Sequence, residues 1–254
     1  MILALALVAI GAPLLPLPDP VQPAAPSFGE PWPPQLRYPC GTDELGRDVC
    51  SRLIYGARLS LFIAACAAIG SVVTGTWIGL LAGYFGGFLD EVLMRSTDVV
   101  LSFPMLLLAI GVAALFEPSS TVLLFVIVAV GWTTTARTVR AEVMSIAQST
   151  HVAAALGLGA SRTRILLRHI LPLLWPTLLT LAAITASHAL LVDAGLSFIG
   201  LGVPPPAPSW GRMLSESQAY YRIAPWLMLF PGLMLTYAVA AFQLIAHGCT
   251  QRRR

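Results

Sequence analysis

Few residues in this sequence could do chemistry, and their spacing forms no familiar catalytic or metal-binding arrangement. Every one of the fifteen Lys and Arg positions is arginine, so the chain has no lysine. It therefore lacks the amine that a P-loop, a Schiff base or a Ser-Lys dyad requires. The four cysteines show no Cys-x-x-Cys spacing, and the four histidines are too scattered to predict a zinc site. We expect no catalytic residue, no resident cofactor and no metal, so any driven work must draw its energy from another subunit.

Two ionisable residues fall inside one long apolar run. Apart from Asp98, at the first position of the predicted span 98–116, Asp193 is the only acid in any of the predicted membrane spans, and an acid within a span marks either a functional site or a hydrogen-bonded structural group. His188 lies five residues earlier, about 140° around a straight helix, so the two side chains should not share a face. Both are candidates for lining a path across the membrane, and the structural alternative stays open.

The segment "STHVAAALGLGASRTRILLRHILP", residues 149–172, places arginines between two apolar runs. Ser149 or Thr150 is expected to cap a short, nearly bare alanine helix, and the glycines after it permit a sharp exit. Ser161 is expected to cap a second helix that leads to Pro172. The segment is either a hairpin lying on the membrane with snorkelling arginines or a docking element for a cytoplasmic partner. The residues that could contact a partner are Ala153, Ala154, Ala155, Gly157, Gly159, Arg162, Arg164 and Arg168.

The composition is that of a polytopic membrane protein. The 254 residues are 57% hydrophobic and 11% charged, and the mean hydropathy is +0.79. A membrane helix needs roughly 20 apolar residues. Six runs qualify, at approximately 1–17, 59–82, 98–116, 120–138, 171–196 and 225–247. For the first run, a cleaved signal peptide is the alternative, although no basic leader precedes it.

Arginine placement predicts the orientation. With six spans both termini lie on one side, which then carries nine arginines against six on the other. By the positive-inside bias the side with nine is cytoplasmic, and it includes the segment 149–172. Because the arginines cluster at the ends of apolar runs, they indicate contact with the lipid bilayer and no nucleic-acid partner.

Two outer segments carry further candidates. Residues 18–58 begin with a proline-rich tether, followed by a capped turn around Asp43 and a helix expected to lie on the membrane surface. Within it, Cys40 and Cys50 either form a disulfide or remain two small hydrophobic residues. In the second segment, around "GVPPPAPSWGRML", Trp210 is expected to anchor at the interface or to touch a delivered ligand or protein. The candidates for contact with a delivering protein are Trp210, Arg212, Glu216 and Arg222.

Several motifs in one order resemble the permeases of binding-protein-dependent ABC importers. They are the segment 149–172 together with "GTDELGRDVCSRLIYGARLSL", "GLLAGYFGGFLDEVLMRSTDVVLSFPMLLLAI", "LVDAGLSFIGLGVPPPAPSWGRML" and "APWLMLFPGL". Within that family the chain looks like the second, C-type permease of the dipeptide, oligopeptide and nickel branch. The resemblance implies an all-α type I importer permease with six transmembrane helices, in a bacterial cytoplasmic membrane with both termini cytoplasmic. It also implies three kinds of partner: a homologous B-type permease, two cytoplasmic ATPases that bind ATP and Mg²⁺, and an extracytoplasmic binding protein.

The resemblance makes the segment 149–172 the coupling helix that sits in the ATPase. Ala154, Ala155 and Gly159 match the family motif, but Ala153 stands where the family has glutamate and Leu156 where the branch often has arginine. Docking should therefore depend more on shape and on the arginines that follow. The expected divisions are an N-terminal span with its proline-rich extracytoplasmic segment at 1–58, a permease domain at 59–248 with a coupling loop at about 139–170, and a basic cytoplasmic tail at 249–254.

Three alternatives were weighed against a peptide permease. The cargo could be nickel or another small solute, because specificity in such importers lies largely in the binding protein. A structural or channel protein would use the membrane-lying hairpin. An intramembrane serine protease built on Ser161 and His188 fails, since Arg162 replaces the small residue that such a motif needs.

Overall fold

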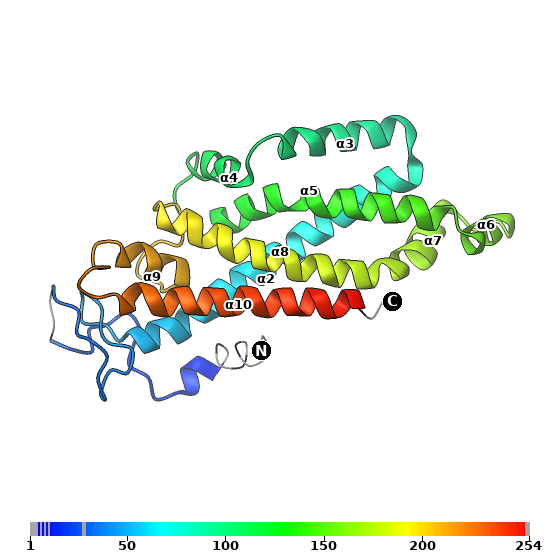
Figure 1. Ribbon diagram of the computed structural model, residues 1–254. Coiled ribbons are helices and arrows are strands. Elements are labelled where there is room, and N and C mark those ends of the chain that lie inside the picture. Colours follow the sequence, from blue (N-terminus) through cyan, green and yellow to red (C-terminus); the bar gives the residue numbers. More distant parts are fainter. Residues whose placement is uncertain (1–4, 6, 8, 10, 27–28, 252–254) are drawn as a thin grey trace.

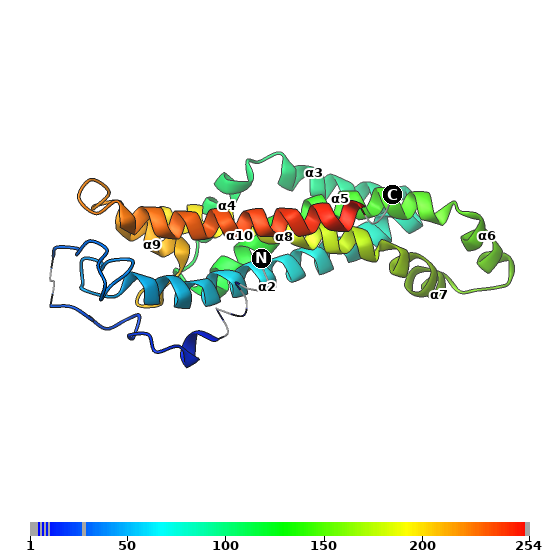
Figure 2. The ribbon, with the colours of Figure 1, turned by 60° about the horizontal axis from the view of Figure 1, so that its bottom comes forward.

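The computed structural model describes residues 5, 7, 9, 11–26 and 29–251. In this part of the chain the regular structure is helical apart from two isolated β-bridges, Gln35 with Tyr38 and Thr42 with Asp48. Figures 1 and 2 show an elongated bundle in which α2, α5, α8 and α10 run lengthwise, with α9 at one end and α6 and α7 at the other. This all-α architecture agrees with the expected fold class.

The helices are η1 (Ala12–Leu14), α2 (Val49–Phe85), α3 (Gly87–Leu101), α4 (Met105–Ala113), α5 (Ser120–Ala147), α6 (Thr150–Gly157), α7 (Arg162–Ile165), η2 (Leu166–Ile170), η3 (Leu171–Leu174), α8 (Trp175–Phe198), α9 (Trp210–Ser217) and α10 (Trp226–Gln251).

Four stretches of the described chain are long and apolar enough to cross a membrane: Val49–Phe85, Ser120–Ala147, Arg162–Phe198 and Trp226–Cys249. They contain four of the predicted spans. The predicted span at 98–116 is wrong as a single helix, because α3 and α4 meet there at 86°. A residue before proline is pushed out of the helical region, so the helix stops ahead of Pro104, which then starts α4. A count of six needs this pair as one span and also the predicted span 1–17, of which residues 1–4, 6, 8 and 10 lie outside the described residues.

Helix α2 begins earlier than the sequence suggested. Asp48 accepts a hydrogen bond from the backbone N–H of Ser51 and so caps the helix, which continues without a break to Phe85. Its 37 residues span about 55 Å at 1.5 Å per residue. The expected surface-lying helix before the span is therefore wrong: Arg52 and Arg58 belong to the first turns of α2, and the helix is long enough for those turns to stand clear of the lipid.

Glycines at every fourth position bring α2 and α5 together. A Cβ added to Gly75 would lie 2.5 Å from the carbonyl oxygen of Trp132, and one added to Gly79 would lie 2.6 Å from that of Ala136. Gly83 repeats this contact against Arg140 at 2.7 Å. Because no side chain separates the two backbones, α2 and α5 pack as one unit along much of their length. That unit carries the segment that follows α5.

Candidate translocation and coupling surfaces

The helix pair that follows α5 forms a hairpin, and we use that word for residues 149–170. Ser149 is the N-cap of α6, as expected, although its hydroxyl donates to Ile146 O instead of accepting from a helix N–H. Gly157 is the last helical residue. The N–H of Ala160 then donates to Ala155 O at 3.0 Å, and the N–H of Gly159 donates to Leu156 O at 2.9 Å.

These two hydrogen bonds form a Schellman motif, which requires a left-handed residue just past the helix. Gly159 takes that position with a φ of +83°. Ser161 then caps α7, since its hydroxyl accepts from the N–H of Arg164 at 3.4 Å. The sharp exit and the second cap agree with the sequence analysis.

The hairpin is anchored along one side only. Val152, Ile165 and Ile170 are fully buried and pack in one cluster with Val139 and Val143 of α5. On the other side the first of the alanines are exposed, and the tip residue Leu158 is 90% exposed. Figure 2 shows the hairpin projecting past the ends of the long helices. It is thus a rigidly based projection whose outer surface has no cover from the described chain.

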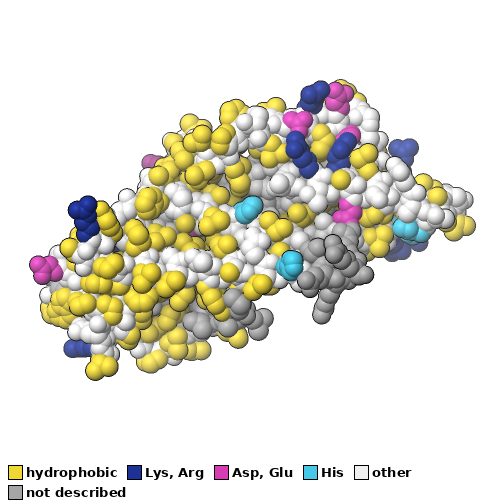
Figure 3. Space-filling view, viewed as in Figure 1, with side chains coloured by type: hydrophobic (Ala, Val, Ile, Leu, Met, Phe, Trp, Pro, Cys, Tyr) yellow, Lys and Arg dark blue, Asp and Glu magenta, His cyan; other side chains and the backbone are white. Residues whose placement is uncertain are grey.

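The candidate residues of the hairpin divide between its two sides. Ala155 packs inward, whereas Ala153 and Ala154 face outward. The exposed candidates also include Gly157, Gly159, Arg162, Arg164 and Arg168. In Figure 3, acidic and basic side chains gather mostly toward the end of the molecule that carries the hairpin, whereas much of the middle of that face is hydrophobic.

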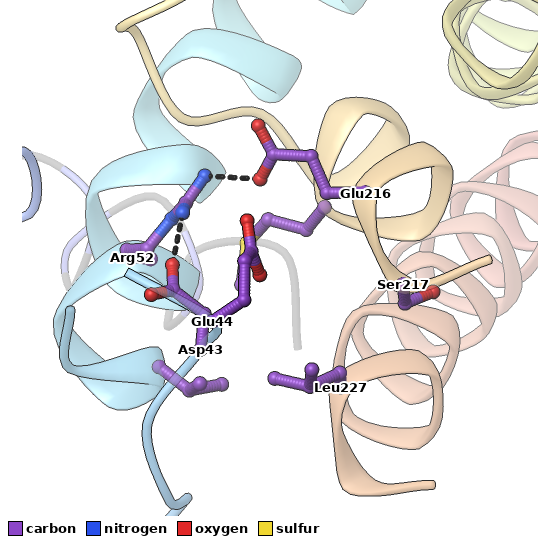
Figure 4. Close-up of a pocket in the computed structure, with 8 residues that line it drawn as sticks. Asp43, Glu44, Arg52, Glu216, Ser217 and Leu227 are labelled. Atoms are coloured by element: carbon purple, nitrogen blue, oxygen red, sulfur yellow. Dashed lines mark hydrogen bonds and ion pairs between the residues drawn. The ribbon is translucent and has the colours of Figure 1, made fainter. Parts of the chain in front are cut away.

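Five charged residues meet at the opposite end, and we call Asp43, Arg47, Arg52, Arg212 and Glu216 the α9 cluster. Arg52 is 1% exposed and lies between two carboxylates: it pairs with Asp43, and its Nη2 donates to Glu216 Oε2 at 2.7 Å. Figure 4 shows these side chains pointing toward one another from the turn before α2, from α2 itself and from α9. Glu216 also accepts from Arg212 Nε at 2.8 Å. A buried arginine with two carboxylate partners ties the three segments together.

The turn before α2 is closed in two ways. Asp43 Oδ1 accepts from the N–H groups of Leu45 and Arg47, and Gly46 supplies the left-handed residue with a φ of +74°. Cys40 and Cys50 form a disulfide across it, with their Cα atoms 5.2 Å apart. Of the two alternatives that the sequence left open, the structure thus has the disulfide. Burial raises the pKa of the Glu44 carboxyl above its ordinary value in this crowded turn.

Trp210 is buried inside the bundle, so its side chain cannot act as the surface anchor or contact residue expected from sequence. Its side chain is 0% exposed, and the indole N–H donates to Leu53 O at 3.0 Å. The backbone N–H of the same residue donates to Ser60 Oγ. Trp210 is therefore the residue by which α9 packs on α2, and the structure leaves it no surface for contact with a partner.

The other candidates at this end differ in how free they are. Arg212 and Glu216 are partly buried and engaged in the α9 cluster. Arg222 is exposed, with its guanidinium 5.6 Å from the ring centre of Tyr221. Of the four residues proposed to meet a delivering protein, Arg222 is the most available.

The structure separates His188 from Asp193, as their spacing predicted. His188 is exposed and lines a cavity of about 190 Å³ between α4, α5 and α8. Asp193 is 1% exposed, does not line that cavity, and accepts a hydrogen bond from Ser197 Oγ at 3.3 Å. Its burial favours the structural alternative for Asp193 in this conformation, whereas His188 remains a candidate for a path.

A comparison with known protein families shows the family to which the chain belongs. Residues 75–254 match the family described as binding-protein-dependent transport system inner membrane component. The chain belongs to this family. It is thus a multi-pass membrane permease and a transport subunit, in agreement with the resemblance seen in its motifs.

Relatives with curated names cover most of the permease. It is 39% identical over 85% of its length to 71% of the dipeptide transport system permease protein DppC of Alkalihalophilus pseudofirmus. It is 41% identical over 85% of its length to 73% of a putative peptide transport system permease protein of Brucella suis. A glutathione transport system permease protein, GsiD of Pectobacterium atrosepticum, is 36% identical over the same share, with 71% of the relative covered.

Solved structures match the fold. A chain of the MetNI methionine ABC transporter, in an inward-facing conformation, aligns with a TM-score of 0.66 at 17% identity. The alignment covers 79% of the permease and 95% of that chain. At this identity the match carries the fold alone, which is that of a type I ABC importer permease.

Proposed function

We propose that the permease pairs with a homologous permease to form the path along which an ATP-driven importer moves di- or oligopeptides. Peptides are proposed as the cargo because about two residues in five, over 85% of the chain, are identical to permeases named for peptide and dipeptide transport. A soluble binding protein delivers the peptide on one side of the membrane. Two ATPases bound on the other side supply the energy.

The hairpin is the proposed ATPase contact. Its exposed alanines allow a partner surface to approach the α6 backbone, and Arg162, Arg164 and Arg168 supply charge for acidic groups on that partner. Lying flat on lipid is the other use for such a hairpin. Its projection beyond the long helices favours the protein partner. ATP and Mg²⁺ are bound by the ATPases in this proposal, since the permease has no lysine for a P-loop.

Coupling then follows from the continuity of α5 with the hairpin. Because Val152 and Ile165 pack into the same cluster as Val139 and Val143 of α5, a displacement of the hairpin moves α5. The glycine seam makes α2 move with it. When the two ATPases close on ATP, they bind the outward-open arrangement of the permease pair more tightly than the inward-open one. ATP binding therefore shifts the pair from inward-open to outward-open.

In the proposed orientation, the hairpin and both termini lie in the cytoplasm of a bacterium, and the α9 cluster lies on the extracytoplasmic side. The arginine distribution supports this. The Cys40–Cys50 disulfide supports it as well, since disulfides persist on the oxidising side of such a membrane. Arg222, which is exposed in the turn after α9, is then the first candidate to face the binding protein, and the partly buried Arg212 and Glu216 are the others.

Reconstitution tests the proposal. The permease, its homologous partner, the two ATPases and the binding protein are placed in vesicles, and uptake of a labelled dipeptide is measured with ATP and with a non-hydrolysable analogue. We expect uptake only with ATP and only with the complete set. If the complex takes up nickel or another solute but no peptide, the assignment of peptides as the cargo is wrong. A permease that purifies without ATPases or a second permease would overturn the assembly.

A further inference from the structure

The cavity between α4, α5 and α8 carries several polar side chains in a mostly apolar lining. On α5, Ile127, Gly131, Thr134 and Thr138 face it at intervals of three and four residues. On α8, Leu181, Thr185 and His188 do the same. These intervals put each set on one side of its helix, so two helical faces converge on one space. A Cβ on Gly131 would lie 3.9 Å from Thr185 Cγ2, which shows how near the faces come.

Two threonines elsewhere on the exposed surface of the long helices use their hydroxyls in hydrogen bonds to carbonyls of their own helix. The hydroxyl of Thr180 donates to Pro176 O at 3.0 Å, and that of Thr236 donates to Gly232 O at 2.8 Å. Each bond returns the hydroxyl to its own helix, as a side chain facing lipid requires. Thr138 does likewise, donating to Thr134 O at 2.9 Å.

The remaining polar groups of the cavity make no hydrogen bond to their own helix. Within the described chain, neither the hydroxyls of Thr134 and Thr185 nor the imidazole of His188 makes a hydrogen bond. Polar side chains in a membrane protein face a water-filled space or a partner when they lack such bonds, because hydrocarbon offers none. Three unbonded groups around one cavity therefore indicate that water, a polar ligand or a polar group of a partner meets them there.

We propose that this cavity is the permease's share of the translocation path, and that Thr134, Thr185 and His188 hydrogen-bond the backbone amides of a passing peptide. The inference rests on the proposed function for its cargo. A hydroxyl and a neutral imidazole each donate and accept, which matches the N–H and C=O groups that every peptide presents. The described residues that line the cavity include no Asp, Glu, Lys or Arg. The path thus recognises the peptide backbone and leaves the charge of the cargo's side chains to the binding protein.

Cysteine accessibility tests this in the reconstituted complex. The free cysteines are first removed as Cys66→Ala and Cys249→Ala, with the Cys40–Cys50 disulfide retained. Single variants Thr134→Cys and Thr185→Cys are compared with Thr180→Cys and Thr236→Cys. All four are threonines on spanning helices, and the last two bond to their own backbones. The probe is a cationic methanethiosulfonate reagent.

We expect the reagent to modify positions 134 and 185 about tenfold faster than 180 and 236, since a hydrated cavity admits it and lipid does not. Modification at 134 and 185 should abolish peptide uptake while the ATPases still hydrolyse ATP. Equal rates at all four positions, as a covering lipid or partner helix would give, would overturn the proposal. So would unchanged uptake after modification.

The side-chain chemistry is tested with His188→Leu and Thr185→Val. We expect the uptake of an acidic, a neutral and a basic dipeptide to fall by the same factor in each variant. A fall confined to one charge class would overturn the backbone-recognition part. Failure of the proposed function is a separate result, because a complex that imports nickel but no peptide would still give the accessibility pattern if the cavity is the path.

Discussion

The two ends of the bundle differ in how far the chain satisfies its own groups. At the α9 end, Arg52 is buried against Asp43 and Glu216, Trp210 is buried against α2, and a disulfide closes the turn. At the hairpin end, Leu158 and the arginines are exposed, and only one side of α6 packs.

The difference indicates which end needs a partner to be complete. The α9 cluster has paired its charges and lies beside the buried Trp210, so these residues gain little from another protein, and at this end a partner contact falls to exposed residues such as Arg222. An exposed leucine beside unburied arginines on a rigid base retains that gain. The α9 cluster is thus internally satisfied, whereas the outer side of the hairpin is open, and this contrast between the two regions can be tested.

The largest effect is expected from Arg52→Ala. Removal of the guanidinium takes the fully buried cation from between Asp43 and Glu216 and leaves Arg47, which also pairs with both carboxylates, as their shared cation. Breaking such a buried pair costs about 3–5 kcal/mol, and the remaining arginine puts the expected loss at the lower end of that range. The melting temperature of the purified permease in detergent should fall accordingly. Arg222→Ala, at an exposed arginine of the same end, is the control and should change stability by less than about 0.5 kcal/mol. Equal losses in the two variants would contradict the account of the α9 cluster.

Loss of the disulfide comes next. The bond joins residues ten apart in sequence, and opening a loop of that size costs about 2–3 kcal/mol through the unfolded chain. The double variant Cys40→Ala with Cys50→Ala should therefore melt lower than the parent, and reductant should lower the parent but leave the variant unchanged. Protease cleavage at the hairpin should not differ. Faster cleavage there would show that the two ends are not independent.

Gly159→Val tests the hairpin end. A β-branched residue at a φ of +83° costs about 1–2 kcal/mol or more, which opens the Schellman motif. Peptide-stimulated ATP hydrolysis in the complex should be lost while the permease still assembles in the membrane. Gly157→Ala is the matched control, because Gly157 is helical with open space around it, and coupling should persist. Normal uptake by the Gly159 variant would refute the role of the turn.

A smaller effect is expected with pH at the α9 end. Burial raises the pKa of Glu44 in the folded state above its value in the unfolded chain. The folded state therefore binds this proton more tightly, and the cost of burying the charged carboxylate is relieved as pH falls toward the unfolded value. The melting temperature of the parent should rise, relative to Glu44→Gln, on mild acidification from pH 7. The opposite slope would contradict the burial.

The smallest effect is expected from Ala153→Glu, which restores the residue that the family resemblance predicts. Ala153 is exposed on the first turns of α6, where a negative charge is tolerated near the helix N-terminus. Assembly should be unchanged, and the coupling of ATP hydrolysis to uptake should alter by less than about threefold. A complete loss of coupling would mean that the bare surface at this position is itself required.

The hairpin could be predicted from sequence because its determinants are local. The Ser161 cap, the left-handed Gly159 and the buried residues at helical spacing all act within a few positions of one another. The break before Pro104 was equally local, and the rule for residues that precede proline could have found it. The apolar run through it hid the signal.

The α9 end could not be predicted in the same way. Arg52 and Glu216 are 164 residues apart, and Trp210 is 157 residues from the carbonyl that it contacts. Such contacts leave no periodic pattern, so an arginine at the head of a span was read as a surface anchor. The unbonded hydroxyls of the cavity could not be predicted either, because the sequence around a threonine does not show whether its hydroxyl bonds to its own helix.

One measurement tests the central claim most directly. A photo-crosslinking amino acid is placed at Leu158, on the tip of the hairpin, and in a matched variant at Leu36, which is equally exposed near the α9 end. The assembled importer is irradiated in membranes, and the adducts are identified by mass spectrometry. The account predicts an ATPase adduct from position 158 and none from position 36. Lipid adducts alone from position 158, or ATPase adducts from both positions, would contradict it.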